Sequence, residues 1–422
     1  MKGDLREKYN SEVVSTLFHA CFVLLHKDKE SMGINMNTDN TKEQLEALRD
    51  QIDAADAEIL SAFTKRMEVA SKISECKRQG GLPVADPERE RRKLASVTSS
   101  VDEELCSYTQ VLYSLLFELS RSYQEKLVCK RSALYDEIAG AVENTEKLFP
   151  QSARIACQGV EGAYSQLACE RLFRVPEIMY FGSFENVFAA IDKGLCNYGI
   201  LPLENSTAGS VNKVYDLMMK YNFKIVRSVR LKVDHSLLAV RGAEKSGIKE
   251  IYSHEQAVGQ CGEFLRSLGD VKITYYENTA AAAKAVAESG RTDIAALCSH
   301  SCAELYGLSC LASSVQDKGN NYTRFICISK NLEIYPGADK TSIMMVISHK
   351  PGSLYKVLSR FYALGINLLK LESRPIPERN FEFMFYFDLE TSIYSSEYIQ
   401  LICELDSLCE DFRYLGSYSE LV

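Results

Sequence analysis

Apolar residues recur at a three-four spacing from residue 41 to residue 79, which predicts one long amphipathic helix. The apolar positions are Leu45, Leu48, Ile52, Ala55, Ile59, Ala62, Val69, Ile73 and Cys76. Arg66 is the one position of this face that breaks the apolar series. A helix of about 38 residues is roughly 57 Å long at 1.5 Å per residue, which exceeds the width of a compact domain of this size. We therefore expect a partner chain to cover its apolar face.

Two further helices are predicted after the pair Gly80-Gly81, which is a plausible helix stop. Asp86 and Pro87 are typical of an N-cap and a first helical residue, and the helix they open would run through Leu94. A third helix from about residue 101 to 129 carries a second apolar stripe. That stripe consists of Leu105, Tyr108, Leu112, Leu115 and Leu119.

From Arg154 onward the pattern changes to short β runs that alternate with helices, which predicts an α/β domain with ligands at the carboxyl ends of its strands. The predicted strands are residues 155–157, 198–203, 225–233, 273–276, 294–298 and 325–328. A smaller unit follows Pro336 and Gly337, and its β-α-β-β-α-β order is the ferredoxin-like arrangement. Its predicted elements are residues 343–348, 354–364, 367–373, 383–389, 396–408 and 412–417.

These patterns divide the chain into five segments. We expect an N-terminal extension at 1–40, an all-α domain at 41–130, a helical linker at 131–152, an α/β domain at 153–330 and a ferredoxin-like unit at 340–422. In the extension, the apolar run at 13–25 is too short for a membrane span and lacks both a basic lead and an Ala-x-Ala exit. We interpret it as an appended helix, or as the product of a start upstream of the true Met32 or Met36.

Composition narrows the class of protein. The 422 residues are 46% hydrophobic and 25% charged, as expected of a globular chain with several domains. The net charge of −8 argues against a nucleic-acid or anionic-membrane surface, so an anionic substrate needs a local cationic pocket. The 14 cysteines are scattered, without a Cys-x-x-Cys pair or zinc-type histidine spacing. We expect reduced thiols, a cytoplasmic protein, and no metal or other cofactor.

Polar residues on the inward faces of the helical domain are candidates for anion binding. Lys77 lies 11 residues after Arg66, close to three helical turns, so the two cations point the same way. The alternative is an ordinary buried ion pair, or an arginine that reaches the surface. The full polar set comprises Arg49, Arg66, Lys77, Asp86, Arg89, Glu90 and Gln124.

This set, with Leu48, Ile52 and Asp53, resembles the all-helical chorismate mutases residue for residue. The resemblance implies an intertwined homodimer, or a higher homo-oligomer, in which one site takes its Arg49 from the partner chain. The rearrangement of chorismate to prephenate needs no nucleophile; it needs a folded dicarboxylate and stabilised charge on the breaking ether oxygen.

Each residue of the set has a role by this resemblance. Arg49 and Arg66 would bind carboxylates, while Arg89 supports the polar network. Lys77 and Gln124 would donate to the ether oxygen. Asp86 and Glu90 would hold the hydroxyl end and orient Arg89. The alternative is a salt-bridge lattice on the surface of a helical bundle.

In the α/β region, three stretches place polar groups at strand ends or at a helix start: residues 159–165, 201–206 and 320–325. Residues 154–329 resemble prephenate dehydratases, on Thr323-Arg324-Phe325, Pro202-Leu203-Glu204-Asn205, Ser253-His254 and Gln260-Cys261. The implied reaction removes ring hydroxyl and ring carboxylate from prephenate, giving phenylpyruvate, carbon dioxide and water.

The dehydratase roles follow from the same resemblance. Thr323 would act as the acid or polarise the departing hydroxyl. Arg324 would bind a substrate carboxylate bidentately, with Asn205, Ser253 and Gln260 as hydrogen-bonding partners. His254 remains open between a general base and a structural histidine at a strand end, so it is not in the catalytic set.

Two segments of the C-terminal unit resemble the amino-acid-binding segments of the ACT domain attached to prephenate dehydratases. They are Gly352, Ser353 and Leu354 at a strand-to-helix turn, and Glu372, Ser373 and Arg374 at a strand end. The resemblance implies that L-phenylalanine binds between two such units and inhibits the dehydratase. Free amides at Gly352 and Ser353 suit a carboxylate. The alternative is a docking domain without a ligand.

Taken over residues 42–422, the resemblance implies a bifunctional enzyme of phenylalanine biosynthesis. Two alternatives stay open. One is arogenate dehydratase activity, although the fused mutase region, which makes prephenate, favours prephenate. The other is a phenylalanine-responsive binding protein with decayed catalytic domains, against which the intact polar sets of both domains argue.

Overall fold

The computed structural model describes residues 38–128, 133–376, 382–395 and 409–422, together with Tyr398, Leu401 and Leu405. The chain divides into two compact units, Met1–Lys72 and Ile73–Val422. The apolar run at 13–25 and the predicted helix at 396–408 lie wholly or mostly outside the described residues. No helix within the described ranges is long and apolar enough to cross a membrane.

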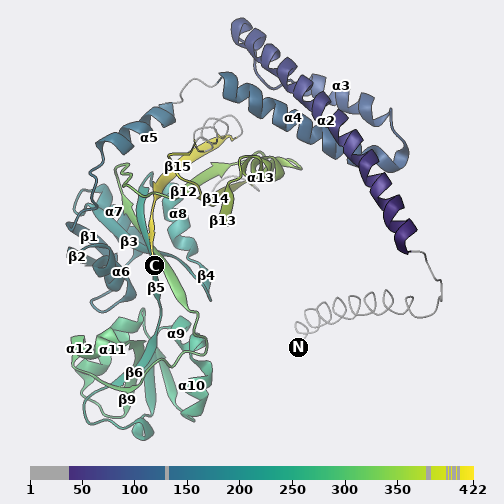
Figure 1. The fold of residues 1–422 in the computed structure, drawn as a ribbon. Helices are drawn as coiled ribbons and strands as arrows, with labels where there is room; N and C mark the ends of the chain where they lie inside the picture. The colour runs from purple at the N-terminus through teal and green to yellow at the C-terminus, as the bar shows by residue number, and fades with distance from the viewer. Residues whose placement is uncertain are drawn as a thin grey trace. The chain divides into compact units, whose positions relative to one another are not determined.

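Three helices follow one another in the N-terminal region (Figure 1). They are α2 (Thr38–Gly80), α3 (Pro87–Thr98) and α4 (Glu103–Val128). The predicted stop of α2 is confirmed, since Gly81 has a φ of +63°, a conformation that glycine adopts without a steric penalty. The predicted cap of α3 is also confirmed: the Asp86 carboxylate accepts a hydrogen bond from the Arg89 amide at 3.0 Å. The helix continues to Thr98 instead of ending at Leu94.

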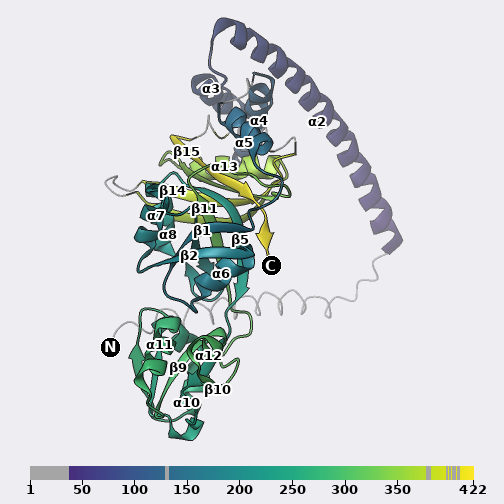
Figure 2. The same cartoon turned by 90° about the vertical axis from the view of Figure 1, so that its left-hand side faces the viewer.

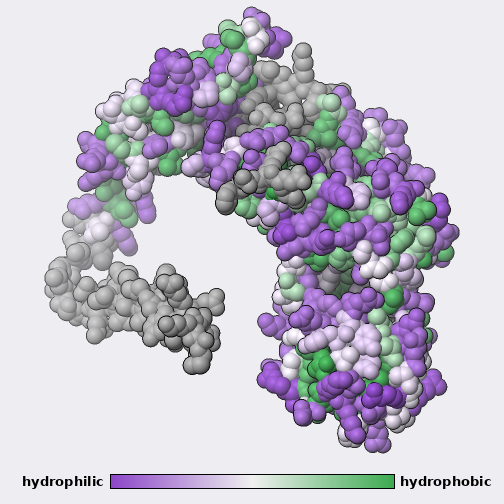
Figure 3. All heavy atoms as spheres, turned by 180° about the vertical axis from the view of Figure 1, so that it is seen from behind, coloured by the Kyte–Doolittle hydropathy of each residue, from purple (hydrophilic) through white to green (hydrophobic). Residues whose placement is uncertain are grey.

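The apolar stripes of α2 and α4 form a surface in the single chain. Large apolar side chains are exposed on both helices, namely Leu45, Leu48, Ile52, Ile59, Leu105, Tyr108, Leu112 and Leu115. In Figure 3, hydrophobic patches alternate with hydrophilic ones over the helical region. Among the described side chains of these three helices, Ala70 is the one buried apolar group. Neither stripe is therefore buried in the single chain.

The first lobe of the α/β region is built on a seven-stranded mixed sheet in the order β16-β5-β11-β3-β1-β2, with β4 on β3. Its strands are β1 (Ser152–Gln158), β2 (Val175–Phe181), β3 (Tyr198–Asn205), β4 (Gly209–Ser210), β5 (Lys224–Lys232), β11 (Tyr322–Ser329) and β16 (Glu420–Leu421). Its helices are α6 (Tyr164–Leu172), α7 (Phe184–Asp192) and α8 (Asn212–Lys220). Four predicted strands are confirmed as β1, β3, β5 and β11.

The second lobe has its own five-stranded sheet in the order β10-β6-β9-β7-β8. Its strands are β6 (His235–Ala239), β7 (Glu250–Ser253), β8 (Lys272–Tyr275), β9 (Ile294–Ser299) and β10 (Ser309–Ala312). Its helices are η1 (Lys245–Gly247), α9 (Glu255–Gln260), α10 (Gly262–Ser267), α11 (Thr279–Ser289) and α12 (Ser301–Tyr306). The predicted strands β8 and β9 are confirmed. The sequence analysis missed β6, β7 and β10 of this sheet, and β2 of the first sheet.

The α/β region is thus two sheets, where the sequence predicted one alternating domain. Only Val233 and Asp234 separate β5 from β6, and neither residue is a glycine or proline that would mark a break. The two lobes are joined there and again between β10 and β11 (Figure 1). The two connections bind each other, because the Val233 amide donates to the Asn321 carbonyl at 2.8 Å.

A third, fully antiparallel sheet in the order β13-β14-β12-β15 forms the C-terminal unit. Its elements are β12 (Lys340–Val346), α13 (Ser353–Ala363), β13 (Asn367–Pro375), β14 (Phe383–Glu390) and β15 (Asp411–Tyr418). The chain then returns to the first lobe, where β16 pairs in parallel with β5 (Figure 2). This return was not predicted, since two residues are too short for a strand pattern.

The predicted linker is helical but is not a free connector. It contains α5 (Ala133–Asn144), and Ile138 of this helix is 3% exposed. Ile138 packs into the same hydrophobic cluster as Ile343, Phe361 and Phe387 of the C-terminal unit. The helix is therefore part of the core on which the third sheet rests.

Candidate active sites

Strands β3 and β11 place two pairs of polar side chains on opposite faces of the first sheet. In their antiparallel register Thr323 lies opposite Asn205, and Arg324 lies opposite Glu204. Successive side chains of a strand point to opposite faces. Asn205 and Thr323 therefore share one face, and Glu204 and Arg324 share the other.

On the first of these faces, backbone amides fix the orientation of the Asn205 side chain. Its Oδ1 accepts hydrogen bonds from the amides of Thr207 at 3.0 Å and Ala208 at 2.9 Å. Its Nδ2 must then be the donor to Asn321 Oδ1 at 2.8 Å and to Thr323 Oγ1 at 2.9 Å. Because the Thr323 oxygen accepts this bond, its own hydroxyl proton is left to donate elsewhere.

Gln260 of α9 brings the second lobe to the same polar residues. Its Oε1 accepts from Asn321 Nδ2 at 2.9 Å, and its Nε2 donates to Thr207 Oγ1 at 3.0 Å. We call Asn205, Thr207, Gln260, Asn321 and Thr323 the amide cluster. The sequence predicted three of these residues, and Thr207 and Asn321 are additions. Their signal was proximity, since each lies two residues from a predicted site residue.

Arg324 does not lie beside the Thr323 hydroxyl. The residue is 6% exposed, and its guanidinium binds the Asp388 carboxylate, Tyr418 Oη at 2.6 Å and Glu204 Oε1 at 3.2 Å. Burial opposes the charge, yet Tyr418 and Asp388 raise the pKa of Arg324 above its usual range. The predicted role as ligand of a substrate carboxylate is therefore corrected, because protein groups on the opposite face already occupy this guanidinium.

Glu204 extends that network to the C-terminal sheet. Its Oε2 accepts from Lys370 Nζ at 2.5 Å, and Lys370 also donates to Ser210 at 2.9 Å. Burial alone would raise the pKa of Glu204, but Lys370 and Arg324 outweigh it and hold that pKa below the ordinary value. The carboxylate therefore stays ionised between two cations.

Two further predictions are revised in the second lobe. Ser253 is fully buried and donates to the Leu297 carbonyl at 2.7 Å, so its hydroxyl joins β7 to β9 and is not part of the amide cluster. His254 caps α9, where its Nδ1 accepts from the Gln256 amide at 3.2 Å. Of the two interpretations of His254, this bond supports the structural one.

The mutase set is held on three helices. Arg49 is exposed and Arg66 is half-buried on α2. Lys77, on the same helix, donates to the Val84 carbonyl at 2.5 Å. Gln124 of α4 is 7% exposed, and its backbone carbonyl accepts from Ser74 at 3.3 Å. The C-terminal part of α2 therefore contacts α4 close to Lys77 and Gln124.

The sequence predicted that Asp86 and Glu90 orient the Arg89 guanidinium. In the structure their carboxylates bind other groups. The Glu90 carboxylate is bound by Arg121, whose Nη1 lies 2.5 Å from each of its oxygens. Asp86 binds the backbone amide of Arg89, whose side chain is exposed. Arg121 was missed, although it stands one helical turn before Gln124, a spacing that places both on one face.

In the C-terminal unit, part of the predicted effector site is already engaged. Gly352, with a φ of +83°, precedes α13, but the Ser353 amide donates to the Lys350 carbonyl at 3.1 Å and is not free as predicted. Glu372 accepts from Ser210 at 2.5 Å. Arg374 binds Asp216 through two bonds, at 2.9 and 3.0 Å.

These contacts place Glu372 and Arg374 against the first lobe. The other two residues of the set are Leu354, which packs at the edge of the C-terminal core, and Ser373, which is exposed and pairs with Phe385. The structure thus separates the predicted effector residues into a turn before α13 and a docking strand.

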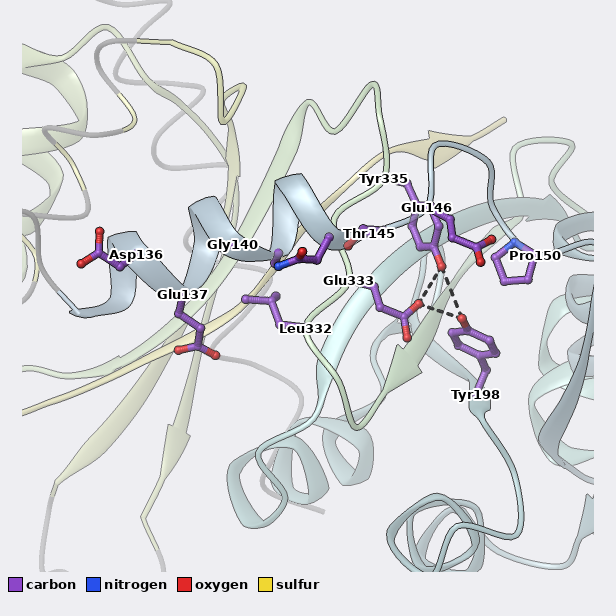
Figure 4. Close-up of a pocket in the computed structure, with 12 residues that line it drawn as sticks. Asp136, Glu137, Gly140, Thr145, Glu146, Pro150, Tyr198, Leu332, Glu333 and Tyr335 are labelled. Atoms are coloured by element: carbon purple, nitrogen blue, oxygen red, sulfur yellow. Dashed lines mark hydrogen bonds between the residues drawn. The ribbon is translucent and has the colours of Figure 1, made fainter.

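A cavity of about 640 Å³ lies between α5 and the first sheet, and no residue of either polar set lines it (Figure 4). Glu333 accepts hydrogen bonds there from Tyr198 and Tyr335, each at 2.7 Å. Its lining also includes Asp136, Glu137 and Glu146. Four carboxylates would repel a dicarboxylate substrate, so the cavity is not a candidate site for either reaction.

Comparison with known proteins defines the class of each part. Residues 48–125 match the family model "Chorismate mutase type II", and residues 155–333 match "Prephenate dehydratase". The first range holds the helical polar set, and the second holds the amide cluster. Two enzyme classes are thus joined in one chain.

Relatives with the same combination extend over nearly the whole chain. A bifunctional chorismate mutase/prephenate dehydratase of Aquifex aeolicus is 31% identical over 378 residues, which cover 89% of this chain and 98% of the relative. Arogenate dehydratase/prephenate dehydratase 2 of Arabidopsis thaliana is 35% identical over 311 residues, covering 71% and 81%. The chain belongs to the bifunctional chorismate mutase/prephenate dehydratase family. It is therefore an enzyme of phenylalanine biosynthesis with both activities.

Solved structures share part of this fold. A prephenate dehydratase of Arthrobacter aurescens, described as a complex with L-Phe, is 26% identical with a TM-score of 0.58, over 63% of this chain and 89% of that one. A structure described as GqqA, a novel type of quorum quenching acylase, is 31% identical with a TM-score of 0.58, over 63% and 97%.

Proposed function

We propose that the amide cluster is the dehydratase site and that Thr323 donates a hydrogen bond to the departing ring oxygen of prephenate. The observation that carries this proposal is the bond from Asn205 Nδ2 to Thr323 Oγ1, which leaves the threonine proton for the substrate. In the reaction the electrons of the breaking carbon–carboxylate bond form the aromatic ring as carbon dioxide leaves. The carbon–oxygen bond breaks at the same time, so a donor at that oxygen stabilises the developing charge.

The mutase site is formed by the helical polar set together with a second copy of the chain. The exposed apolar stripes of α2 and α4 support this arrangement, because they leave the helical region without a core of its own. Arg49 and Arg66 then hold the two carboxylates of chorismate, and Lys77 and Gln124 donate to the ether oxygen. Arg121, in place of Arg89, orients the Glu90 carboxylate through two hydrogen bonds.

The C-terminal unit is a ferredoxin-like ACT domain that makes the dehydratase sensitive to L-phenylalanine. Its strand order, with β12 and β14 central, is the order expected of that arrangement, and a relative is described as a complex with L-Phe. The effector binds at the turn before α13, at an interface between two copies. The domain boundaries and the cytoplasmic location remain predictions from the sequence.

Inhibition has a physical route through the alternating faces of β3 and β11. Asn205 and Thr323 face the site, while their neighbours Glu204 and Arg324 bind Lys370, Asp388 and Tyr418 of the C-terminal sheet. A shift of that sheet would move both strands, and with them the donors of the site.

The direct test supplies purified protein with chorismate and follows prephenate and phenylpyruvate, with and without L-phenylalanine. We expect phenylpyruvate to form and its rate to fall when L-phenylalanine is added. If no phenylpyruvate forms with chorismate and none forms with added prephenate, the proposal is contradicted.

Arogenate is the second candidate substrate of the dehydratase, because the Arabidopsis relative is named for both substrates. We propose prephenate, since the fused mutase region makes it. A comparison of kcat/KM for the two compounds decides: a higher value for arogenate would reverse the assignment. The acylase description of one solved relative is not transferred, because no observation on this chain favours it.

A further inference from the structure

A buried histidine, His235, contacts the amide cluster through Gln260. His235 begins β6, directly after the connection between the lobes, and is 2% exposed. Its Nε2 lies 3.0 Å from Gln260 Oε1, the oxygen that also accepts from Asn321. The Tyr164 ring lies nearly perpendicular to the imidazole, with ring centroids 6.1 Å apart.

The directions of the hydrogen bonds determine where the imidazole proton sits. Backbone amides fix Asn205 Oδ1 as an acceptor, so Asn321 must accept through Oδ1 and donate through Nδ2. Gln260 then presents its Oε1 to both Asn321 and His235. An amide oxygen cannot donate, so His235 carries its proton on Nε2.

The other ring nitrogen supports the same tautomer. His235 Nδ1 is buried and has no hydrogen-bond partner among the described residues. A proton on Nδ1 would be a buried donor without an acceptor, which is unfavourable because its hydration is lost and not replaced. Burial also lowers the pKa of His235, against the Gln260 bond and the Asp234 charge. The ring is therefore neutral, with a lone pair on Nδ1.

We propose that His235 is a positioning residue of the dehydratase site, which locks Gln260 so that the amide cluster holds one hydrogen-bond direction up to Thr323. The proposal rests on the dehydratase site proposed above. Gln260 comes from α9 of the second lobe. It forms hydrogen bonds with Thr207 and Asn321, which lie outside that lobe's sheet. Without the His235 donor, the Gln260 amide could rotate by half a turn, and both of these bonds would be lost.

Two variants of the same position separate a donor from a space-filling role. His235→Gln places an amide NH2 near the position of Nε2 and keeps the donor, whereas His235→Asn is too short to reach Gln260. We expect His235→Asn to lower the kcat for prephenate by about 100-fold, the size of effect that a displaced catalytic group produces. His235→Gln should lose less than about tenfold. Chorismate mutase turnover by the same polypeptides is the internal control, and it should not change.

A double-mutant cycle with Gln260→Ala tests whether His235 acts through Gln260. If it does, His235→Asn adds less than about threefold to the loss already caused by Gln260→Ala, because residues that act as a unit are not additive. If the wild type turns over prephenate and the two losses are fully additive, the proposal for His235 is overturned. A wild type without prephenate turnover would instead contradict the proposed dehydratase site.

Nitrogen NMR of the wild-type protein tests the tautomer without relying on a variant that folds. With 15N-histidine, the signal absent from His235→Gln should show a protonated Nε2 and an unprotonated Nδ1 at pH 7. A protonated Nδ1 would overturn the proposal.

Discussion

At the scale of single residues, the chain uses neighbouring positions for different tasks. Asn205 and Thr323 form the amide cluster, while Glu204 and Arg324, one residue away on each strand, join the network to the C-terminal sheet. The sequence predicted Thr323 and Arg324 as neighbours in one site. It could not show that alternation along β11 separates them, because the strand boundary at Tyr322 was not evident from the pattern.

The hydroxyl of Thr323 is the group that the dehydratase account needs. Thr323→Val keeps the shape but removes the donor, and we expect kcat for prephenate to fall by about 100- to 1,000-fold, as when one oxyanion donor is removed. Thr323→Ser keeps the hydroxyl and should retain a kcat within about tenfold of the wild type. Steady-state kinetics with prephenate measures both; equal losses in the two variants would contradict a donor role.

Asp388 is the buried counter-charge of Arg324, and its removal should be costly. Asp388 is 0% exposed, and Asp388→Asn removes the negative charge that balances the buried Arg324 guanidinium. We therefore expect the free energy of unfolding to fall by about 3–5 kcal/mol. Asp192→Asn breaks an exposed pair with Lys330 and should cost less than about 1 kcal/mol. Urea unfolding of the two variants compares them, and similar losses would argue against a buried network.

At the scale of elements, the periodicity of apolar residues predicted the long helices and several of the longer strands. The helices α2, α3 and α4 were predicted, with the stop of α2 and the N-cap of α3, and so were the strands β3, β5 and β9. The second sheet was missed because β6 follows β5 without a turn residue. The return of β16 to the first sheet depends on contacts between distant segments, which no local pattern records.

Gly416 of β15 makes the close approach between the third sheet and β5 possible. It has a φ of +135°, and an added Cβ would overlap the Ile225 carbonyl oxygen. We expect Gly416→Ala to destabilise the protein by more than about 2 kcal/mol, since it combines a strained backbone with a backbone clash. Gly247→Ala is the matched control, because its Cβ would meet nothing within 4 Å. Equal melting temperatures for the two variants would contradict this role of Gly416.

At the scale of the whole molecule, the two enzyme activities depend on different kinds of assembly. The amide cluster is complete within one chain, whereas the helical region leaves its apolar stripes exposed. The second copy that we propose would bury these stripes and complete the mutase site. Mutase activity should therefore depend on self-association, and dehydratase activity should depend on it less.

A charge in the α2 stripe tests this dependence. Ile59 is 64% exposed in the single chain, and Ile59→Asp would place a carboxylate in the proposed apolar interface. We expect weaker self-association by sedimentation and at least about tenfold lower mutase turnover, with prephenate turnover retained. Glu58→Gln, next to it but outside the apolar series, should change neither. An unchanged oligomer with full mutase activity would contradict the proposed interface.

The central claim is that one chain carries two separate active sites, one on the helices and one at the amide cluster. The most direct measurement assays Arg66→Ala and Thr323→Ala for both reactions, with chorismate and with added prephenate. We predict that Arg66→Ala abolishes chorismate turnover and still converts prephenate to phenylpyruvate, while Thr323→Ala does the reverse. Loss of both reactions in each variant, with unfolding temperatures like that of the wild type, would contradict the two-site account.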